Sequence, residues 1–226
     1  MLKIGLTGGI ASGKTVVGEM LVALGAHLVQ ADRIAHQLMR PGEPVYNQVV
    51  GYFGRTILNP DGSVNRAELA KLAFGSADPA SQAAQNDPTA GAAPSIPSRV
   101  EELNRIVHPA VIRAQEEWMQ AIGRSDPRAV AIVEAALIFE AGAAKRFDRL
   151  IVVTCTDEQR VARFAARQKV DLETARQEVA RRMAAQLPES EKAKAADYVI
   201  DNSGSLNHTR EQVEQVWAEL QSDHRT

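Results

Sequence analysis

The sequence lacks most features of secreted and membrane proteins. Its 226 residues contain a single cysteine, Cys155, so no disulfide can form within the chain, as is usual in a reducing cytosol. No apolar run approaches the roughly 18 residues that a membrane span requires. The N-terminus enters a strand-like segment at Leu2 without a signal-peptide pattern. We therefore expect a cytoplasmic protein with no membrane partner.

An excess of charge of one sign is also lacking. The net charge is −2, whereas proteins that bind nucleic acid normally present a strongly basic surface. A hydrophobic content of 45% and a charged content of 24% are ordinary for a globular protein with a real core. We expect a monomer with no nucleic-acid partner.

Five apolar segments alternate with helical patterns along the chain, at residues 2–8, 27–32, 129–139, 149–156 and 198–202. Strands that read as continuous apolar runs and alternate with helices favour a parallel sheet that is covered on both faces. The sequence thus predicts an α/β fold.

Helix boundaries can be predicted at three places. Residues 101–122 have a helical pattern, but Pro109 is expected to break it. Thr156 followed by Gln159 is a capping-box pattern, and Asp171 is a suitable cap for the next helix. These two helices carry many arginines. The segment 76–98 is rich in Ala, Ser, Gly and Pro without apolar periodicity, which predicts a flexible insertion.

The stretch "LTGGIASGKT" matches the phosphate-binding loop, with Gly8, Gly13, Lys14 and Thr15 at the required spacing. Glycines allow backbone conformations that are closed to other residues, so that the amide groups can form a concave anion site at a helix N-terminus. Lys14 can then bridge the terminal phosphates and Thr15 can offer its hydroxyl to Mg²⁺. This loop alone does not distinguish kinases, GTPases and ATPases.

Asp32 stands at the carboxyl end of the second predicted strand, and ligands bind at the carboxyl ends of the strands in open parallel sheets. A carboxylate there can accept a hydroxyl proton or hold metal-bound water. The alternative is that Asp32 only caps the following helix. Glu134 also has two possible interpretations: it contacts metal-bound water, or it simply lies at a strand edge.

Several longer motifs resemble the dephospho-coenzyme A kinase family of bacteria. In the family's order along nearly the whole chain they are "IGLTGGIASGKT", "ADRIAHQLMRPGEPVY", "FGRTILNPDGSVNRAELAKLAF", "LNRIVHPAV", "ALIFEAG" and "ADYVIDNSG". The resemblance implies ATP-dependent phosphorylation of the ribose 3′-hydroxyl of dephospho-CoA, with Mg²⁺ as cofactor and ATP and dephospho-CoA as partners.

The resemblance also implies an architecture. It is a P-loop NTPase-type, five-stranded parallel sheet flanked by helices, with a helical substrate-binding insertion and a helical lid. The nucleotide-binding core would comprise residues 1–32, 126–156 and 187–226. Residues 33–125 would form the helical CoA-substrate-binding region, and residues 157–186 the lid.

The resemblance assigns residues to three roles. Asp32, Lys14, Arg163 and Arg167 are expected to be catalytic, the last two within a lid pattern that falls near Arg160. Thr15 is expected to bind the metal. ATP binding is assigned to Gly8, Gly9, Ala11, Ser12, Gly13, Lys14, Thr15 and Val16, and to Asn202 and Gly204 in an adenine-side loop.

Four more residues are candidates for substrate binding: His36, His108, Phe139 and Glu140. Three of them have an alternative. His108 can instead be a capping or packing histidine, His36 can face solvent, and Glu140 can pair with a surface arginine. Two other functions stay open, a nucleoside or nucleotide kinase and a nucleotide-dependent switch without chemistry. A switch would not need both Asp32 and several lid arginines, because binding alone does not require neutralisation of transition-state charge.

Overall fold

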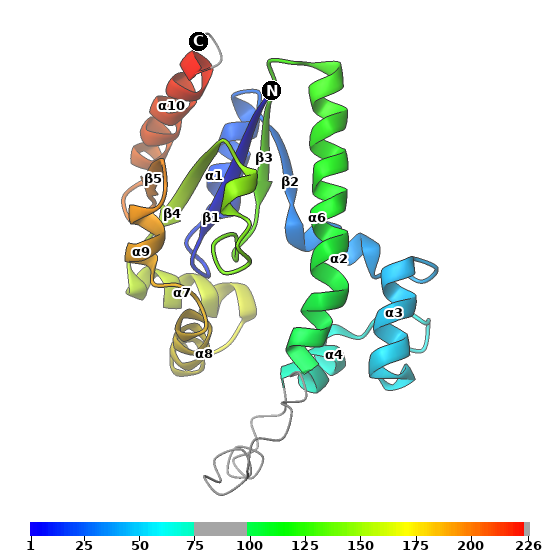
Figure 1. The fold of residues 1–226 in the computed structure, drawn as a ribbon. Coiled ribbons are helices and arrows are strands. Elements are labelled where there is room, and N and C mark those ends of the chain that lie inside the picture. The colour runs from blue at the N-terminus through cyan, green and yellow to red at the C-terminus, as the bar shows by residue number, and fades with distance from the viewer. Residues whose placement is uncertain (75–98, 224–226) are drawn as a thin grey trace, which may run out of the picture. The chain divides into compact units, whose positions relative to one another are not determined.

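The chain divides into two units. The larger comprises Met1–Ala31 and Gln115–Thr226, and the smaller comprises Asp32–Ala114. A parallel β-sheet lies at the centre of the larger unit. The computed structural model describes residues 1–74 and 99–223, so the predicted insertion 76–98 lies outside the described residues. Within them the sheet has five strands in the order β2-β3-β1-β4-β5 (Figure 1). The strands are β1 (Leu2–Gly8), β2 (His27–Gln30), β3 (Val130–Glu134), β4 (Arg149–Thr154) and β5 (Tyr198–Asp201). All neighbouring strands run parallel, which confirms the predicted α/β fold.

Helices cover both faces of this sheet. On one face α1 (Lys14–Ala23) and α10 (Leu206–Asp223) bury Leu21 and Leu220 against Ile4, Ile132 and Ile151. On the other face the C-terminal part of α6 (Arg99–Ser125) packs Met119 and Trp118 on Ala131 and Val133 (Figure 1). Burial on both sides explains why the central strands are continuously apolar rather than alternating.

The predicted strands after the first all extend beyond the observed ends, and the differences at the second and third affect the site. The third ends at Glu134 instead of residue 139, because Glu134 is its last residue that pairs with either neighbour, with Leu6 on β1 and with Gln30 on β2. The apolar residues beyond it, Ile138 and Phe139, pack in a small cluster with Leu150 instead. The second strand ends at Gln30 and α2 (Ala31–Leu38) starts at once. Asp32 is therefore in the first turn of a helix.

The predicted helix break at Pro109 is wrong. The helix α6 continues through this proline from Arg99 to Ser125. An internal proline removes one backbone hydrogen bond and costs about 3 kcal/mol. Apolar residues on both sides of the proline are buried, Val107 and Val111 close by and Met119 further on, and this burial offsets the cost.

The arginine-rich region forms two helices with the predicted caps, α7 (Asp157–Gln168) and α8 (Leu172–Ala184), followed by the short α9 (Glu189–Lys194). The Gln159 N–H donates to Thr156 Oγ1 and the Thr156 N–H donates to Gln159 Oε1, which completes the capping box. The Thr174 N–H donates to Asp171 Oδ1 at 2.8 Å. Both cap predictions are confirmed.

The second unit is helical and has its own buried residues. Its elements are α2, α3 (Pro44–Phe53), the 3-10 helix η1 (Arg55–Ile57), α4 (Arg66–Phe74) and the N-terminal part of α6. Buried side chains come from each of them: Ile34, Val45, Val49, Phe53, Ile57, Leu69, Val107 and Val111. The carboxamide of Asn65 accepts hydrogen bonds from Ala67 and Glu68 and thereby caps α4.

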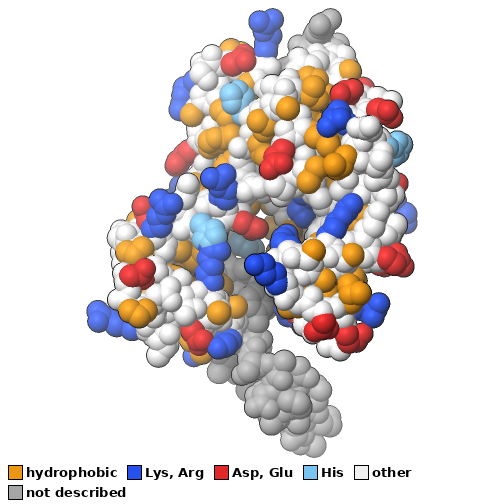
Figure 2. All heavy atoms as spheres, turned by 180° about the vertical axis from the view of Figure 1, so that it is seen from behind, with side chains coloured by type: hydrophobic (Ala, Val, Ile, Leu, Met, Phe, Trp, Pro, Cys, Tyr) orange, Lys and Arg blue, Asp and Glu red, His pale blue; other side chains and the backbone are white. Residues whose placement is uncertain are grey.

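Charges of both signs are interspersed over the face of the molecule that Figure 2 shows. No helix among residues 1–74 and 99–223 is both long and apolar enough to pass through a bilayer. The lone Cys155 is buried, as its apolar surroundings in the sequence suggested.

We expect Leu21→Ala to lower the free energy of unfolding by about 2–5 kcal/mol, because Leu21 is fully buried between α1 and the sheet. The measurement is urea denaturation followed by circular dichroism. Leu24→Ala is the control, since Leu24 ends the same helix with 36% of its surface exposed. Equal losses in the two variants would contradict the described packing of α1.

Candidate active site

The glycine loop lies between β1 and α1, as its motif predicted. Three of its residues adopt left-handed backbone conformations, Gly8 (φ 150°), Ala11 (φ 55°) and Gly13 (φ 98°). A Cβ on Gly8 would lie 2.3 Å from the carbonyl oxygen of Val153, and one on Gly13 would lie 2.0 Å from Asn202 Nδ2. The two glycines thus serve both the turn and the close approach of neighbouring strands and side chains.

Side chains donate hydrogen bonds to the carbonyl oxygens along this loop. Lys14 Nζ donates to the carbonyls of Gly8 and Gly9 at 3.0 and 2.9 Å. Asn202 Nδ2 and Arg163 Nη1 both donate to the carbonyl of Ser12, at 2.8 and 3.3 Å. Carbonyls that are satisfied by side chains leave the loop amides available for an anion.

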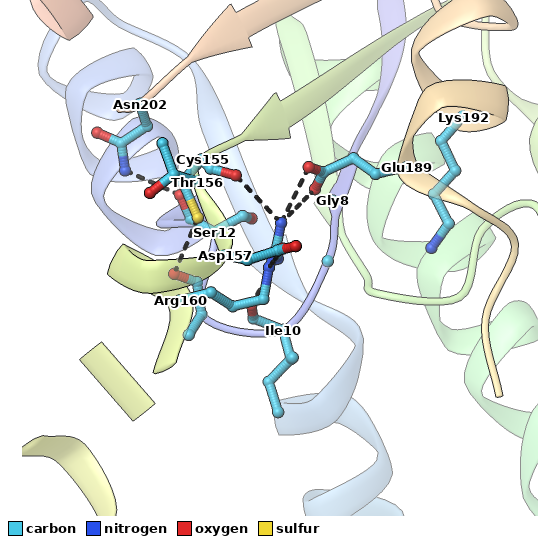
Figure 3. Close-up of polar contacts among 12 residues, drawn as sticks. Gly8, Ile10, Ser12, Cys155, Thr156, Asp157, Arg160, Glu189, Lys192 and Asn202 are labelled. Carbon is cyan, nitrogen blue, oxygen red and sulfur yellow. Dashed lines mark hydrogen bonds and ion pairs between the residues drawn. The ribbon is translucent and has the colours of Figure 1, made fainter. Parts of the chain in front are cut away.

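Arg160 supports the loop from within the protein (Figure 3). Its side chain is fully buried, and Nη1 donates to the carbonyl of Ile10 at 2.7 Å. Nη2 donates to both carboxylate oxygens of Glu189, each at 2.9 Å, and to the carbonyl of Cys155. A guanidinium with these partners positions the loop backbone and is not available to a phosphate. Sequence reasoning grouped Arg160 with the lid pattern and missed this role.

Asn202 is also committed to the loop. It is 4% exposed, and while its amide nitrogen holds Ser12, its Oδ1 accepts a hydrogen bond from Thr209 Oγ1 of α10 at 3.0 Å. Its backbone carbonyl accepts from Arg163 Nη2 at 2.9 Å. Gly204, the other predicted adenine-side residue, lies exposed two positions further on, before α10.

At the carboxyl ends of the strands a carboxylate meets the threonine of the motif. Thr15 Oγ1 donates to Glu134 Oε1 at 3.0 Å, and Gln30 Nε2 donates to Glu134 Oε2 at 2.9 Å. These residues come from α1, β3 and β2 respectively. Among the described residues no group of three or more His, Cys, Asp or Glu side chains could hold a metal. A hydroxyl beside one carboxylate suits Mg²⁺, which keeps several waters and takes its other ligands from phosphates.

The remaining arginines of the predicted lid differ from one another. Arg163 is held by the loop, whereas Arg167 is exposed, with its guanidinium 6.0 Å from the centre of the Phe164 ring. Within α8, Arg181 and Arg182 pair with Glu178. The hydrogen bond from Arg181, with a further one from Arg182, lowers the pKa of Glu178 to about 2. The α8 arginines therefore already have carboxylate partners.

Glu140 forms an ion pair with a buried lysine. Its Oε1 accepts from Lys192 Nζ at 2.8 Å and from the Leu187 N–H at 2.9 Å, and Lys192 is 1% exposed. The partner is a buried lysine rather than a surface arginine, so that alternative was wrong in detail. These contacts join the loop after β3 to the segment between α8 and α9. Phe139 packs beside Ile138 in the neighbouring cluster.

Three predicted site residues belong to the second unit: Asp32, His36 and His108. Asp32 is exposed inside the first turn of α2, which starts one residue earlier at Ala31, so it does not stand at the cap position. His36 is exposed one turn later. His108 is half-buried in α6, and this burial lowers the pKa of its imidazole.

The sheet order, the glycine loop after β1 and the helical layers together define a P-loop α/β protein of the nucleoside-triphosphate-binding class. The sequence model described as dephospho-CoA kinase matches residues 2–88 and 94–208. A relative described as dephospho-CoA kinase, from Syntrophotalea carbinolica, is 38% identical over 97% of this chain and 92% of its own length. The chain belongs to the dephospho-CoA kinase family.

Solved structures share the fold of this chain. The structure of TT1252 from Thermus thermophilus is 30% identical with a TM-score of 0.70, and the similarity covers 97% of each chain. The structure of dephospho-CoA kinase from Campylobacter jejuni has a TM-score of 0.64 over 98% of both chains. At 23% identity the latter supports the fold alone.

We expect Arg160→Met to destabilise the protein by about 3–5 kcal/mol and to weaken ATP binding, because Glu189 loses its buried partner and the Ile10 carbonyl loses its donor. The measurements are urea unfolding and calorimetric titration with ATP. Arg176→Met is the control, since that arginine is 66% exposed and pairs within α8.

The double variant Arg160→Met/Glu189→Gln separates the two effects. It should recover much of the stability, because no unpaired carboxylate remains, but ATP binding should stay weak. Recovery of ATP affinity as well would show that Arg160 only balances Glu189 and does not position the loop.

Proposed function

We propose that this protein transfers the γ-phosphoryl group of ATP to the ribose 3′-hydroxyl of dephospho-CoA, giving CoA and ADP. The observation that carries the proposal is the glycine loop, whose carbonyls are held by Lys14, Arg160 and Asn202 while Thr15 stands beside Glu134. Membership of the family supports the identity of the acceptor. The single buried Cys155 fits a cytoplasmic location.

In this proposal the loop and its helix bind the triphosphate. The backbone from Gly8 to Val16 surrounds the phosphates, and the Lys14 ammonium exchanges its loop carbonyls for phosphate oxygens. Asn202 and Gly204 form the adenine side. Mg²⁺ would be held by Thr15, with Glu134 accepting hydrogen bonds from its water, and it would neutralise charge on the phosphates.

The acceptor substrate is assigned to the second unit, which begins at Asp32 just after β2. Asp32 follows β2 by two residues, and its exposed carboxylate can orient the acceptor hydroxyl and receive its proton. Residues 33–125 are proposed as the substrate-binding region, with His36 and His108 as contacts. Phe139 and Glu140 are assigned to the acceptor side of the core, where the ion pair of Glu140 gives it a positioning role.

The lid is assigned to α7 and α8, residues 157–186. Arg163 already contacts the loop backbone, so it would act on the phosphates from a nearly fixed position. Arg167 is exposed, and lid closure would bring its guanidinium to the transferring phosphoryl group, where removal from water strengthens the pairing.

The test is incubation of the purified protein with ATP, Mg²⁺ and dephospho-CoA, with products identified by mass. Adenosine and AMP are the comparison acceptors, and Lys14→Ala is the inactive control, since it removes the charge aimed at the terminal phosphates. Formation of CoA by the parent alone supports the proposal. Faster phosphorylation of adenosine or AMP would favour a nucleoside or nucleotide kinase.

We expect Asp32→Asn to lower turnover with dephospho-CoA by a factor of about 10²–10⁴, the usual range for a positioned acid–base group. ATP–Mg²⁺ affinity and cooperative melting should stay near the parent values, because the amide keeps the shape of the side chain. Calorimetry and steady-state kinetics measure these quantities. Collapse of ATP–Mg²⁺ binding would identify Asp32 as a metal-shell ligand, and unchanged turnover would exclude it as the base.

We expect Arg167→Ala to lower kcat while the Kd for ATP changes little, because this arginine engages the phosphates only when the lid closes. Arg163→Ala should weaken ATP binding as well, since it removes a donor from the Ser12 carbonyl. Equal loss of affinity and turnover in Arg167→Ala would contradict the closing lid.

A further inference from the structure

The second unit contains a pocket of about 370 Å³ between α2, the turn that follows it and the start of α4. This volume lies within the usual range for small-molecule sites, roughly 300–1,000 Å³. Arginines from three places line it, Arg33 on α2, Arg40 in the turn and Arg66 at the first residue of α4, together with His36 of α2. Figure 2 shows basic side chains gathered on the surface of this unit.

No carboxylate is among the described residues that line this pocket. Among the residues that the structure describes, the guanidinium groups of Arg33, Arg40 and Arg66 make no hydrogen bond and no ion pair within 4 Å. The arginines of α8, by contrast, pair with Glu173 and Glu178 of their own helix. Desolvation lowers the pKa of the Arg66 guanidinium, and the charge of Asp32 opposes this shift.

Three guanidiniums that line one pocket, with no carboxylate among its lining residues, repel one another, and an anion of matching geometry relieves this repulsion. The planar fork of arginine binds phosphate oxygens through two parallel hydrogen bonds. Two linked phosphates match three guanidiniums in charge and extent better than a single phosphate does. The physical chemistry of the pocket therefore favours a diphosphate.

We propose that this pocket binds the diphosphate group of the acceptor, the part of dephospho-CoA that joins its adenosine to pantetheine. This inference rests on the proposed function and gives the second unit its own anion site, separate from the glycine loop. Gln37, which also lines the pocket, supplies an amide donor. Arg40 and Arg66 are specificity-determining residues, because they bind a group that free adenosine lacks.

The spacing along α2 agrees with this assignment. The acceptor's 3′-hydroxyl and 5′-diphosphate are carried by the same ribose, so the groups that bind them must lie close together. Asp32 and His36 are four residues apart and share one face of α2, about one turn or 5.4 Å along the helix axis. The carboxylate proposed for the hydroxyl and the cationic pocket are thus neighbours within one unit.

The test compares Arg40→Gln, Arg66→Gln and the double variant with Arg55→Gln. Arg55 is an exposed arginine of η1 in the same unit and does not line the pocket, so its variant is a matched control for general charge. Each pocket variant should raise the KM for dephospho-CoA about 10-fold to 100-fold, the loss expected when a charge-assisted hydrogen bond is removed. The KM for ATP and the melting temperature should stay at the parent values.

Three outcomes of these kinetics would overturn the proposal. An equal rise in the KM for ATP would show that the arginines bind the phosphates of ATP. An equal effect of Arg55→Gln would show that the change in KM comes from long-range electrostatics and not from binding in the pocket. A KM for dephospho-CoA that stays at the parent value in the double variant would show that the pocket does not hold the acceptor's diphosphate.

A second measurement separates this proposal from the proposed function. Inorganic pyrophosphate is titrated into protein whose glycine loop is saturated with ADP, and the heat of binding is recorded. The parent and Arg55→Gln should bind it, whereas Arg40→Gln/Arg66→Gln should not. Equal binding by all three proteins would overturn the proposal that this pocket binds a diphosphate, even if the parent makes CoA. Failure of the parent to make CoA would overturn the function, while this titration still decides the anion site.

Discussion

The backbone of the glycine loop is the constraint on which the first unit depends. A loop whose amides serve an anion must direct its carbonyls elsewhere, and buried carbonyls need donors. Here the donors come from α1, α7 and the segment after β5, through Lys14, Arg160, Arg163 and Asn202. The order of the strands places these segments around β1, so the sheet topology and the loop geometry require one another.

The same constraint explains why charged groups are buried in this unit. Removing Arg160 from water is costly, and its partners offset this cost. Both oxygens of Glu189 and two backbone carbonyls accept hydrogen bonds from Nη1 and Nη2, whereas the buried Nε makes no hydrogen bond and lies 3.5 Å from Asp157 Oδ1. The Lys192–Glu140 pair follows Glu189 closely in sequence and links the loop after β3 to α9. Two ion pairs with buried cations thus hold α9, the element that follows the arginine-rich helices, against the nucleotide-binding part of the unit.

The arginines illustrate how one residue type serves three purposes in one chain. Buried Arg160 contacts the loop backbone, the arginines of α8 form helix-surface pairs of small energetic value, and Arg33, Arg40 and Arg66 of the second unit line a pocket with no carboxylate among its described lining residues. What distinguishes them is the surroundings of the guanidinium, since its own charge is constant at physiological pH. A basic cluster in a sequence therefore does not by itself indicate an anion site, because the fold decides whether carboxylates already pair with its arginines.

Local signals in the sequence determined the α/β class, the position of the glycine loop and the caps at Thr156 and Asp171, because glycine conformation, apolar periodicity and capping act over a few residues. Tertiary structure alone decided the end of β3 at Glu134, the continuity of α6 through Pro109 and the role of Arg160. A strand ends where its neighbour stops pairing, and a proline in a helix is tolerated when packing on both sides offsets it. Arg160 and Ile10 are 150 residues apart, and no local pattern links a helix side chain to so distant a carbonyl.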